Sequence, residues 1–217
     1  MPRSTATHMS TPTPTPTQSP AWPAHTALAG QRVRLVPLSH DHAPALAAEV
    51  AAAGLDRLWY TLVPPADRMG AEIERRLLLQ ASGSMRPYTV LDAEGRPAGM
   101  TTYMNIDAVH HRVEIGSTWL APRVQRSGLN TEAKWLMLRH AFETLGCIAV
   151  EFRTHRLNQQ SRRAIERLGA QLDGILRHHQ RTADGLLRDT CVYSIVAPEW
   201  PTIDRHLRWL MERPRAT

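Results

Sequence analysis

Residues 112–120 alternate one by one between two faces, as in a β-strand whose two sides meet different surroundings. After a short turn the spacing changes to that of an amphipathic helix, which Gly146 is placed to end. The chain therefore predicts a strand, a tight turn and a long helix in succession. One face of the strand carries Val113, Ile115, Ser117 and Trp119, the other carries Glu114, Gly116, Thr118 and Leu120, and the apolar stripe of the helix is Trp135, Leu138, Ala141, Phe142 and Leu145.

Shorter patterns of the same two kinds predict the other elements. Ser39 and Asp41 are candidate N-caps of a helix that ends near Gly54, and Asn158 caps a helix that stops at Gly169. The remaining expected elements are a helix at 69–81, strands at 32–37 and 148–154, and two hairpins formed by 88–91 with 98–104 and by 174–181 with 187–196.

This order of elements is typical of an α+β fold. We expect a central, mixed but mostly antiparallel twisted sheet of about seven strands, flanked by about four helices. The chain of 217 residues, 42% of them hydrophobic, is sufficient for one substantial core. Residues 1–29 are expected to be a disordered tail, because threonine and proline alternate there and offer little to bury. Residues 30–217 are expected to form a single domain.

Composition narrows the class of protein. The formal net charge of +6 comes from arginines spread along the chain, with Lys134 as the single lysine, so no basic stripe for nucleic acid is expected. No run approaches the roughly 20 apolar residues needed to cross a bilayer, and the N-terminus lacks the apolar core of a secretory signal. The cytoplasm is the expected location, and a monomer or homodimer the expected state. Cys147 and Cys191 are expected to be buried thiols.

Paired histidines do not indicate a metal site. His110 and His111, like His178 and His179, are neighbours on expected strands or their ends, and adjacent strand residues point to opposite faces. Neither pair can chelate one ion, so no metal is expected.

The turn at 125–131, between the strand and the helix, has the form of an anion site. The first N–H groups of a helix have no partner within it and lie at its positive dipole end. Gly128 would let a ligand approach the backbone closely. The turn has neither the lysine of a P-loop nor the three glycines of a dinucleotide fold. A chance surface turn remains the alternative.

The spacing resembles the coenzyme A loop of the GNAT superfamily of N-acetyltransferases, Gln/Arg-x-x-Gly-x-Gly/Ala. Gln125 and Gly128 match this pattern, whereas Asn130 stands where it has glycine or alanine. Four segments resemble the branch that contains the Rim-type ribosomal-protein N-terminal acetyltransferases, and they fall in order on the expected elements, with the resemblance running from about residue 31 to 196. The segments are Val113-Glu114-Ile115-Gly116, Asn130-Thr131-Glu132-Ala133-Lys134, Asn158-Gln159-Gln160-Ser161 and Arg167-Leu168-Gly169-Ala170.

The resemblance implies a sheet splayed between its fourth and fifth strands and acetyl-CoA, or another acyl-CoA, as co-substrate. The backbone of Thr118, Trp119 and Leu120 would pair with the pantetheine arm like an added strand. Gln125 belongs to the loop pattern, and backbone amides would hold the pyrophosphate. A hydroxyl bond from Thr131 to phosphate and a simple helix cap are equally open. The loop amides are those of Arg126, Ser127, Gly128, Leu129, Asn130 and Thr131.

Asn158 and Ser161 have both a structural and a functional interpretation. An asparagine N-cap followed by a small polar residue explains them completely. The resemblance implies instead that Asn158 bonds the cofactor arm and that Ser161 lies near the thiol, where it could protonate the leaving thiolate. Ser161 shares the apolar stripe of its helix, which points it inward, and a buried hydroxyl needs a partner.

Acyl transfer to an amine needs a base, and Glu114 is the candidate. A carboxylate with an ordinary pKa of about 4.3 requires burial to become a good base at neutral pH, and it would act through water. The alternative is an exposed acid paired with Arg112 or Arg153 on a sheet face. Trp59 and Tyr60 fall where the resemblance implies the wall of the acceptor site, although core packing also explains them.

The sequence thus predicts an N-acetyltransferase that transfers an acyl group directly from acetyl-CoA to a primary amine in a ternary complex. The acceptor is either a protein N-terminus or a small amine. A non-catalytic acyl-CoA-binding or sensing module is the alternative, and nucleotide binding through the loop is a third, weaker hypothesis.

Overall fold

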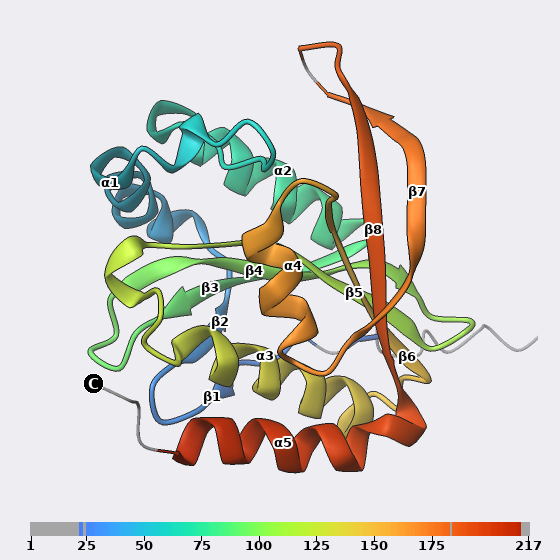
Figure 1. Ribbon diagram of the computed structural model, residues 1–217. Helices are drawn as coiled ribbons and strands as arrows, with labels where there is room; N and C mark the ends of the chain where they lie inside the picture. The colour runs from blue at the N-terminus through green and yellow to red at the C-terminus, as the bar shows by residue number, and fades with distance from the viewer. Residues whose placement is uncertain (1–21, 24, 183, 214–217) are drawn as a thin grey trace, which may run out of the picture.

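A computed structural model describes residues 22–23, 25–182 and 184–213. Its centre is a sheet in which the described residues form eight strands in the order β1-β2-β3-β4-β5-β6-β8-β7 (Figure 1). All neighbouring strands are antiparallel except β5 and β6, which are parallel. The strands are β1 (Leu28–Ala29), β2 (Arg34–Pro37), β3 (Met85–Leu91), β4 (Pro97–Asp107), β5 (Arg112–Leu120), β6 (Ala149–His155), β7 (Gln171–Arg181) and β8 (Leu187–Val196).

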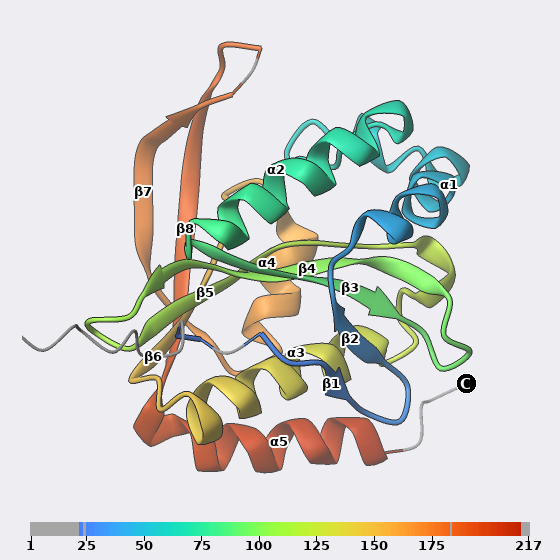
Figure 2. The same ribbon diagram turned by 180° about the vertical axis from the view of Figure 1, so that it is seen from behind.

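Helices cover both faces of this sheet. In Figures 1 and 2, α1 and α2 lie above it, α3 and α5 lie below it, and the β7–β8 hairpin rises beyond the upper face. A π-helical segment, His140–Thr144, continues α3. The predicted α+β class is therefore confirmed. The α-helices are α1 (Ala43–Ala53), α2 (Met69–Ala81), α3 (Leu129–Arg139), α4 (Gln159–Glu166) and α5 (Trp200–Glu212).

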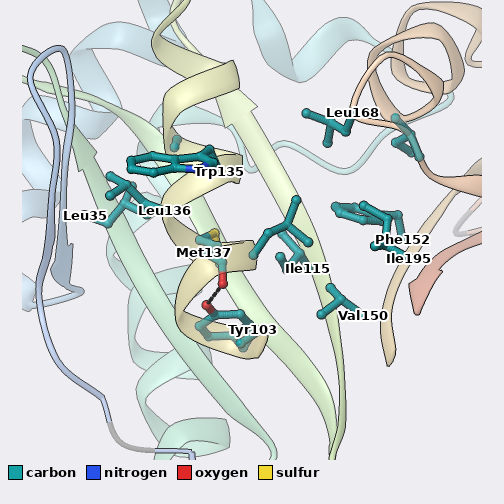
Figure 3. Close-up of a cluster of buried hydrophobic side chains, with 14 of the residues drawn as sticks. Leu35, Tyr103, Ile115, Trp135, Leu136, Met137, Val150, Phe152, Leu168 and Ile195 are labelled. Carbon is teal, nitrogen blue, oxygen red and sulfur yellow. Dashed lines mark hydrogen bonds between the residues drawn. The ribbon is translucent and has the colours of Figure 1, made fainter. Parts of the chain in front are cut away.

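Two hydrophobic clusters hold the layers together, one on each face of the sheet. The larger one joins α3, α4 and α5 to the sheet, and Figure 3 shows Ile115, Met137 and Phe152 within it. The Tyr103 hydroxyl donates a 2.6 Å hydrogen bond to the backbone oxygen of Met137, which ties β4 to α3. The smaller cluster joins α1 and α2 to the opposite face and includes Trp119. Cys147 and Cys191 are buried free thiols, as predicted.

The sheet opens between β5 and β6, the predicted fourth and fifth strands. Their pairing is limited to Arg112–Glu114 with Ala149–Glu151. Beyond Glu114, no described strand pairs with this edge of β5. Its backbone groups there are available to a ligand, and the predicted splay is confirmed.

The alternation predicted for β5 is interrupted in the middle of the strand. Ser117 has a φ of +47°, and the register against β4 shifts so that Gly116 faces Thr102 while Trp119 faces Met100. This bulge moves Trp119 to the α1–α2 face, away from the face of Val113 and Ile115, because one extra residue reverses the direction of those that follow. The prediction that Thr118 shares a face with Glu114 is wrong for the same reason.

Two elements lie outside the expected set. The expected tail of residues 1–29 is too long at its C-terminal end, because Leu28–Ala29 already pair with β2 as β1. Most of that tail, residues 1–21 and 24, lies outside the described residues. The helix α5 makes five helices rather than four in the described chain. It packs Trp200, Ile203 and Leu207 on the larger cluster. None of the described helices is both long and apolar enough to cross a bilayer.

Candidate functional site

The loop before α3 presents backbone N–H groups at a helix start. Arg126 and Gly128 have φ values of +57° and +87°, so the chain turns sharply before Leu129 begins the helix. The first helical hydrogen bond runs from the N–H of Glu132 to the oxygen of Gly128, at 3.0 Å. The N–H groups of Gly128, Asn130 and Thr131 have no acceptor among the described residues. This local geometry is the predicted anion site.

Side chains of the loop hold its shape. The Gln125 amide donates to the backbone oxygen of Leu120 at 2.9 Å, which ties the loop to the end of β5. The Ser127 hydroxyl donates to the oxygen of Val124 and accepts from the N–H of Leu129 at 3.3 Å. Gln125 and Ser127 therefore contribute to the loop through its conformation.

A cavity of about 870 Å³ lies beside these amides. The Arg167 guanidinium, at the end of α4, donates to the Thr131 hydroxyl at 3.1 Å. The Oδ1 atom of Asn130 is buried and accepts no hydrogen bond from the described residues. Free amides and several cations fit a large anionic ligand, and the Asn130 oxygen fits a hydrogen-bond donor on that ligand. The cavity is lined by Arg32, Arg126, Ser127, Gly128, Asn130, Thr131, Arg167, Leu210, Met211, Glu212 and Arg213.

Thr118 and Lys134 form a buried polar contact at the bulge of β5. The Lys134 ammonium donates to the hydroxyls of Thr118 at 2.6 Å and Thr101 at 2.8 Å, and no carboxylate pairs with it within 4.0 Å among the described residues. Burial lowers the pKa of Lys134 to about 7. The Thr118 hydroxyl is thus engaged within the protein, leaving the strand edge for a ligand. The sequence showed Lys134 as the sole lysine but gave no sign of its burial.

Replacing Lys134 by methionine should flatten the pH dependence of stability. The lysine pKa is about 7 in the folded protein and 10.5 when exposed, so the unfolded chain binds more protons between these values. The free energy of unfolding should therefore rise with pH across this window in the wild type. We expect the difference between Lys134→Met and wild type to change steadily from pH 7 to 10.5 in denaturant titrations. Parallel pH profiles would contradict this prediction, and no second lysine complicates the comparison.

Glu114 lies where β5 and β6 begin to diverge, and it is 5% exposed. Asn105 donates to its carboxylate at 2.6 Å, and Arg153 lies 3.6 Å from it. Burial raises the pKa of Glu114, and the Asn105 hydrogen bond and the Arg153 charge oppose this effect without cancelling it. Burial is what the sequence analysis required for Glu114 to act as a base near neutral pH. The alternative pairing with Arg153 is also present, whereas Arg112 pairs with Glu151 at 3.5 Å.

Asn158 and Ser161 lie at the start of α4. The Oδ1 atom of Asn158 accepts a 3.0 Å hydrogen bond from the N–H of Ser161, which makes Asn158 the helix N-cap. Its side-chain amide group makes no hydrogen bond with described residues, and neither does the half-buried Ser161 hydroxyl. The structural interpretation of Asn158 therefore holds, and it leaves donors on both side chains for a ligand.

Trp59 and Tyr60 lie on the connection between α1 and α2. Trp59 is 60% exposed and is therefore not part of the core. The centre of its ring lies 5.6 Å from that of Tyr60 and 5.3 Å from that of His155. A cavity of about 240 Å³ is formed by Trp59, the end of β6 and the tip of the β7–β8 hairpin. It is lined by Trp59, His155, Leu157, Thr182, Asp184, Leu186 and Leu187.

The unpaired edge of β5 forms a path between the loop before α3 and the point where the sheet opens. The amides before α3 lie at one end, the unpaired edge of β5 follows, and Glu114 lies where the splay closes. Such a path suits a long ligand with an anionic head and an amide-bearing arm. No three His, Cys, Asp or Glu side chains converge within the described residues.

Comparisons with known proteins agree with this geometry. A family model described as an acetyltransferase (GNAT) domain matches residues 32–171. A GCN5-related N-acetyltransferase from Brucella melitensis is 29% identical, with a TM-score of 0.79, covering 88% of this chain and 87% of that one. The RimJ of Mycobacterium smegmatis, solved with CoA-disulfide, is 21% identical, with a TM-score of 0.74 and coverage of 88% and 96%.

A curated relative is similar over a shorter stretch. The Bacillus subtilis protein named "Putative ribosomal N-acetyltransferase YdaF" is 31% identical over 107 residues. This match covers 49% of the present chain and 57% of that protein. The similarity thus spans just over half the length of this relative.

Proposed function

This chain belongs to the GNAT family of acetyltransferases, and on that premise we propose that it transfers an acetyl group from acetyl-CoA directly to a primary amine. The observation that carries the proposal is the helix start at Gly128 with free amides, beside a sheet that opens after Glu114. Transfer occurs in a ternary complex, and no covalent enzyme intermediate forms.

The donor binds along the path from loop to splay. Backbone amides at 126–131 hold the pyrophosphate, with Arg126 and Arg167 nearby. The backbone of Thr118, Trp119 and Leu120 pairs with the pantetheine arm, because this edge of β5 has no strand partner in the described chain. The free side-chain amide of Asn158 donates to the same arm.

Two side chains handle protons. Glu114 accepts a proton from the ammonium of the acceptor, through water, and its raised pKa suits this role near neutral pH. The neutral amine attacks the thioester carbonyl, which a backbone N–H beyond the bulge polarises. As the carbon–sulfur bond breaks, the nitrogen loses its surplus proton, and the Ser161 hydroxyl passes a proton to the departing thiolate, so that the amide and free thiol form.

The acceptor is a protein N-terminus or a small amine. The name of YdaF, a putative ribosomal N-acetyltransferase, supports the first class. Trp59 with the 240 Å³ cavity supplies a wall that either class can contact. Tyr60 supports Trp59 through ring contact.

The test combines binding and turnover. Acetyl-CoA should raise the melting temperature by an amount that follows saturation, more than ATP or NAD does. Free thiol should then appear with at least one amine from a panel of peptides and small amines. Protection without thiol release would favour the non-catalytic acyl-CoA-binding module, and protection by ATP or NAD equal to that by acetyl-CoA would favour nucleotide binding.

A further inference from the structure

Arg188 of β8 lies on the same face of the sheet as Glu114. Glu114 pairs with Glu151 of β6, and residues opposite one another in neighbouring strands share a face. His155, four residues along β6 from Glu151, lies on that face and pairs with Thr190. Arg188, two residues from Thr190 along β8, therefore also lies there. The strand geometry brings a guanidinium to the side of the sheet where the amine would be deprotonated.

Arginines elsewhere on β6 and β7, and directly after β6, pair with acids. Arg153 contacts Glu151 at 2.6 Å. Arg156 and Arg177 both contact Asp189, at 3.4 Å and 2.8 Å. The charges of these three arginines are therefore paired with acids within the protein.

Arg188 has no such partner. It forms no ion pair within 4.0 Å among the described residues, and its Nε atom is buried without a hydrogen-bond acceptor there. Burial lowers the pKa of the Arg188 guanidinium, and the charge of Glu114 opposes this. An unpaired, half-buried cation is costly, which a matching anion would relieve.

A cavity lies close to Arg188, although Arg188 is not itself among the residues that line it. Its chain neighbour Leu187 and the nearby His155 line the 240 Å³ cavity beside Trp59. Burial and the charge of Arg188 lower the pKa of His155, so His155 is neutral at pH 7 and does not compete as a cation. Its Nδ1 atom accepts from the N–H of Leu157 at 3.0 Å.

We infer that Arg188 binds a carboxylate carried by one of the two reactants, next to the reacting amine. This inference rests on the proposed acyl transfer and deepens it. A guanidinium and a carboxylate can form two parallel hydrogen bonds, which a neutral amide cannot replace with the same strength. The carboxylate belongs either to the acceptor amine or to a dicarboxylic acyl group on the donor.

Three matched substrate pairs test the inference, each differing by one carboxylate. With acetyl-CoA, the acceptors are aspartyl against asparaginyl tripeptide amides, and alanine against alaninamide. With the asparaginyl peptide, the donors are succinyl-CoA against acetyl-CoA. Values of kcat/KM are compared for wild type, Arg188→Gln and the control Arg177→Gln. The control removes the same charge from an exposed side chain, one that contacts Asp189, the chain neighbour of Arg188.

We expect the wild type to prefer the carboxylate member of at least one pair by about tenfold to a hundredfold, the range for a charged hydrogen bond. Arg188→Gln should abolish that preference and Arg177→Gln should keep it. The substrate pair whose preference is lost in Arg188→Gln shows whether the carboxylate belongs to the acceptor or to the acyl group. Because each result is a ratio, a change in the Glu114 pKa cancels.

Three results would overturn the inference. A wild type that treats both members of every pair alike, or an Arg188→Gln variant that keeps the preference, overturns the role of Arg188 while acyl transfer stands. Absence of thiol release from either donor with every amine overturns acyl transfer, and the inference with it. If Arg188→Gln fails to fold, equal wild-type ratios for every pair still overturn the inference.

Discussion

Replacing Gly128 by valine should abolish the binding of acetyl-CoA while the protein still folds. Gly128 has a φ of +87°, which a β-branched residue adopts only at a cost of about 1–2 kcal/mol or more. Its side chain would also stand at the helix start, where the pyrophosphate must approach the backbone closely. Titration calorimetry with acetyl-CoA should show the affinity of the variant reduced by about a hundredfold or beyond, since several amide contacts depend on that approach.

The control for Gly128→Val is Gly83→Val. Gly83 has a nearly identical φ of +84°, and an added Cβ there meets nothing within 4 Å. Both variants should lose similar stability, because both strain the backbone in the same way. Only Gly128→Val should lose the ligand. Equal affinity in the two variants would mean that the loop does not hold acetyl-CoA.

Replacing Glu114 by glutamine should leave acetyl-CoA binding unchanged and lower kcat by about a hundredfold to ten thousandfold, the usual contribution of a general base. The active form is the carboxylate. Because burial raises the pKa of Glu114, activity in the wild type should rise with pH through a value above that of an ordinary glutamate. The variant should lose this acidic limb. Steady-state kinetics over a pH series measures both effects.

Glu151→Gln is the matched control for this substitution. Glu151 lies opposite Glu114 on β6 and binds Arg153 at 2.6 Å. It should alter kcat far less, because two arginines hold its carboxylate, Arg153 at 2.6 Å and Arg112 at 3.5 Å. If Glu114→Gln loses binding and turnover equally, the residue is structural, and its hydrogen bond with Asn105 is its main role.

Local patterns in the sequence were sufficient for the loop and most elements. The helix at 69–81 and the strand at 112–120 have the predicted bounds, since their periodicity is regular to the ends. The turn at Gly128 was predictable because a glycine between a strand and an amphipathic helix has few other uses. The opening of the sheet between β5 and β6 was predicted from the family resemblance and not from local patterns.

Features set by pairing between distant segments could not be predicted. The bulge at Ser117 arises from the register of β5 on β4, and nothing in 112–120 alone distinguishes it from regular alternation. Trp119 consequently lies on the other face from the one predicted. The strand β1 has two residues, too few for a pattern.

The helix α5 is a different case, because its signal was present. Trp200, Ile203 and Leu207 have helical spacing, and Pro201 lies at the favoured start of a helix. Lys134 and Arg188 gave no such sign. A lysine or arginine is exposed by default, and only the packed structure shows that Lys134 is buried and Arg188 half-buried, with no acid partner for either among the described residues.

The most direct measurement is a crystal structure grown with acetyl-CoA at saturating concentration. We expect the pyrophosphate on the backbone amides at 126–131, the pantetheine arm along β5 beyond Glu114, and the thioester between β5 and β6. Acetyl-CoA bound elsewhere, or absent from these amides, would contradict the proposed site and the chemistry that depends on it.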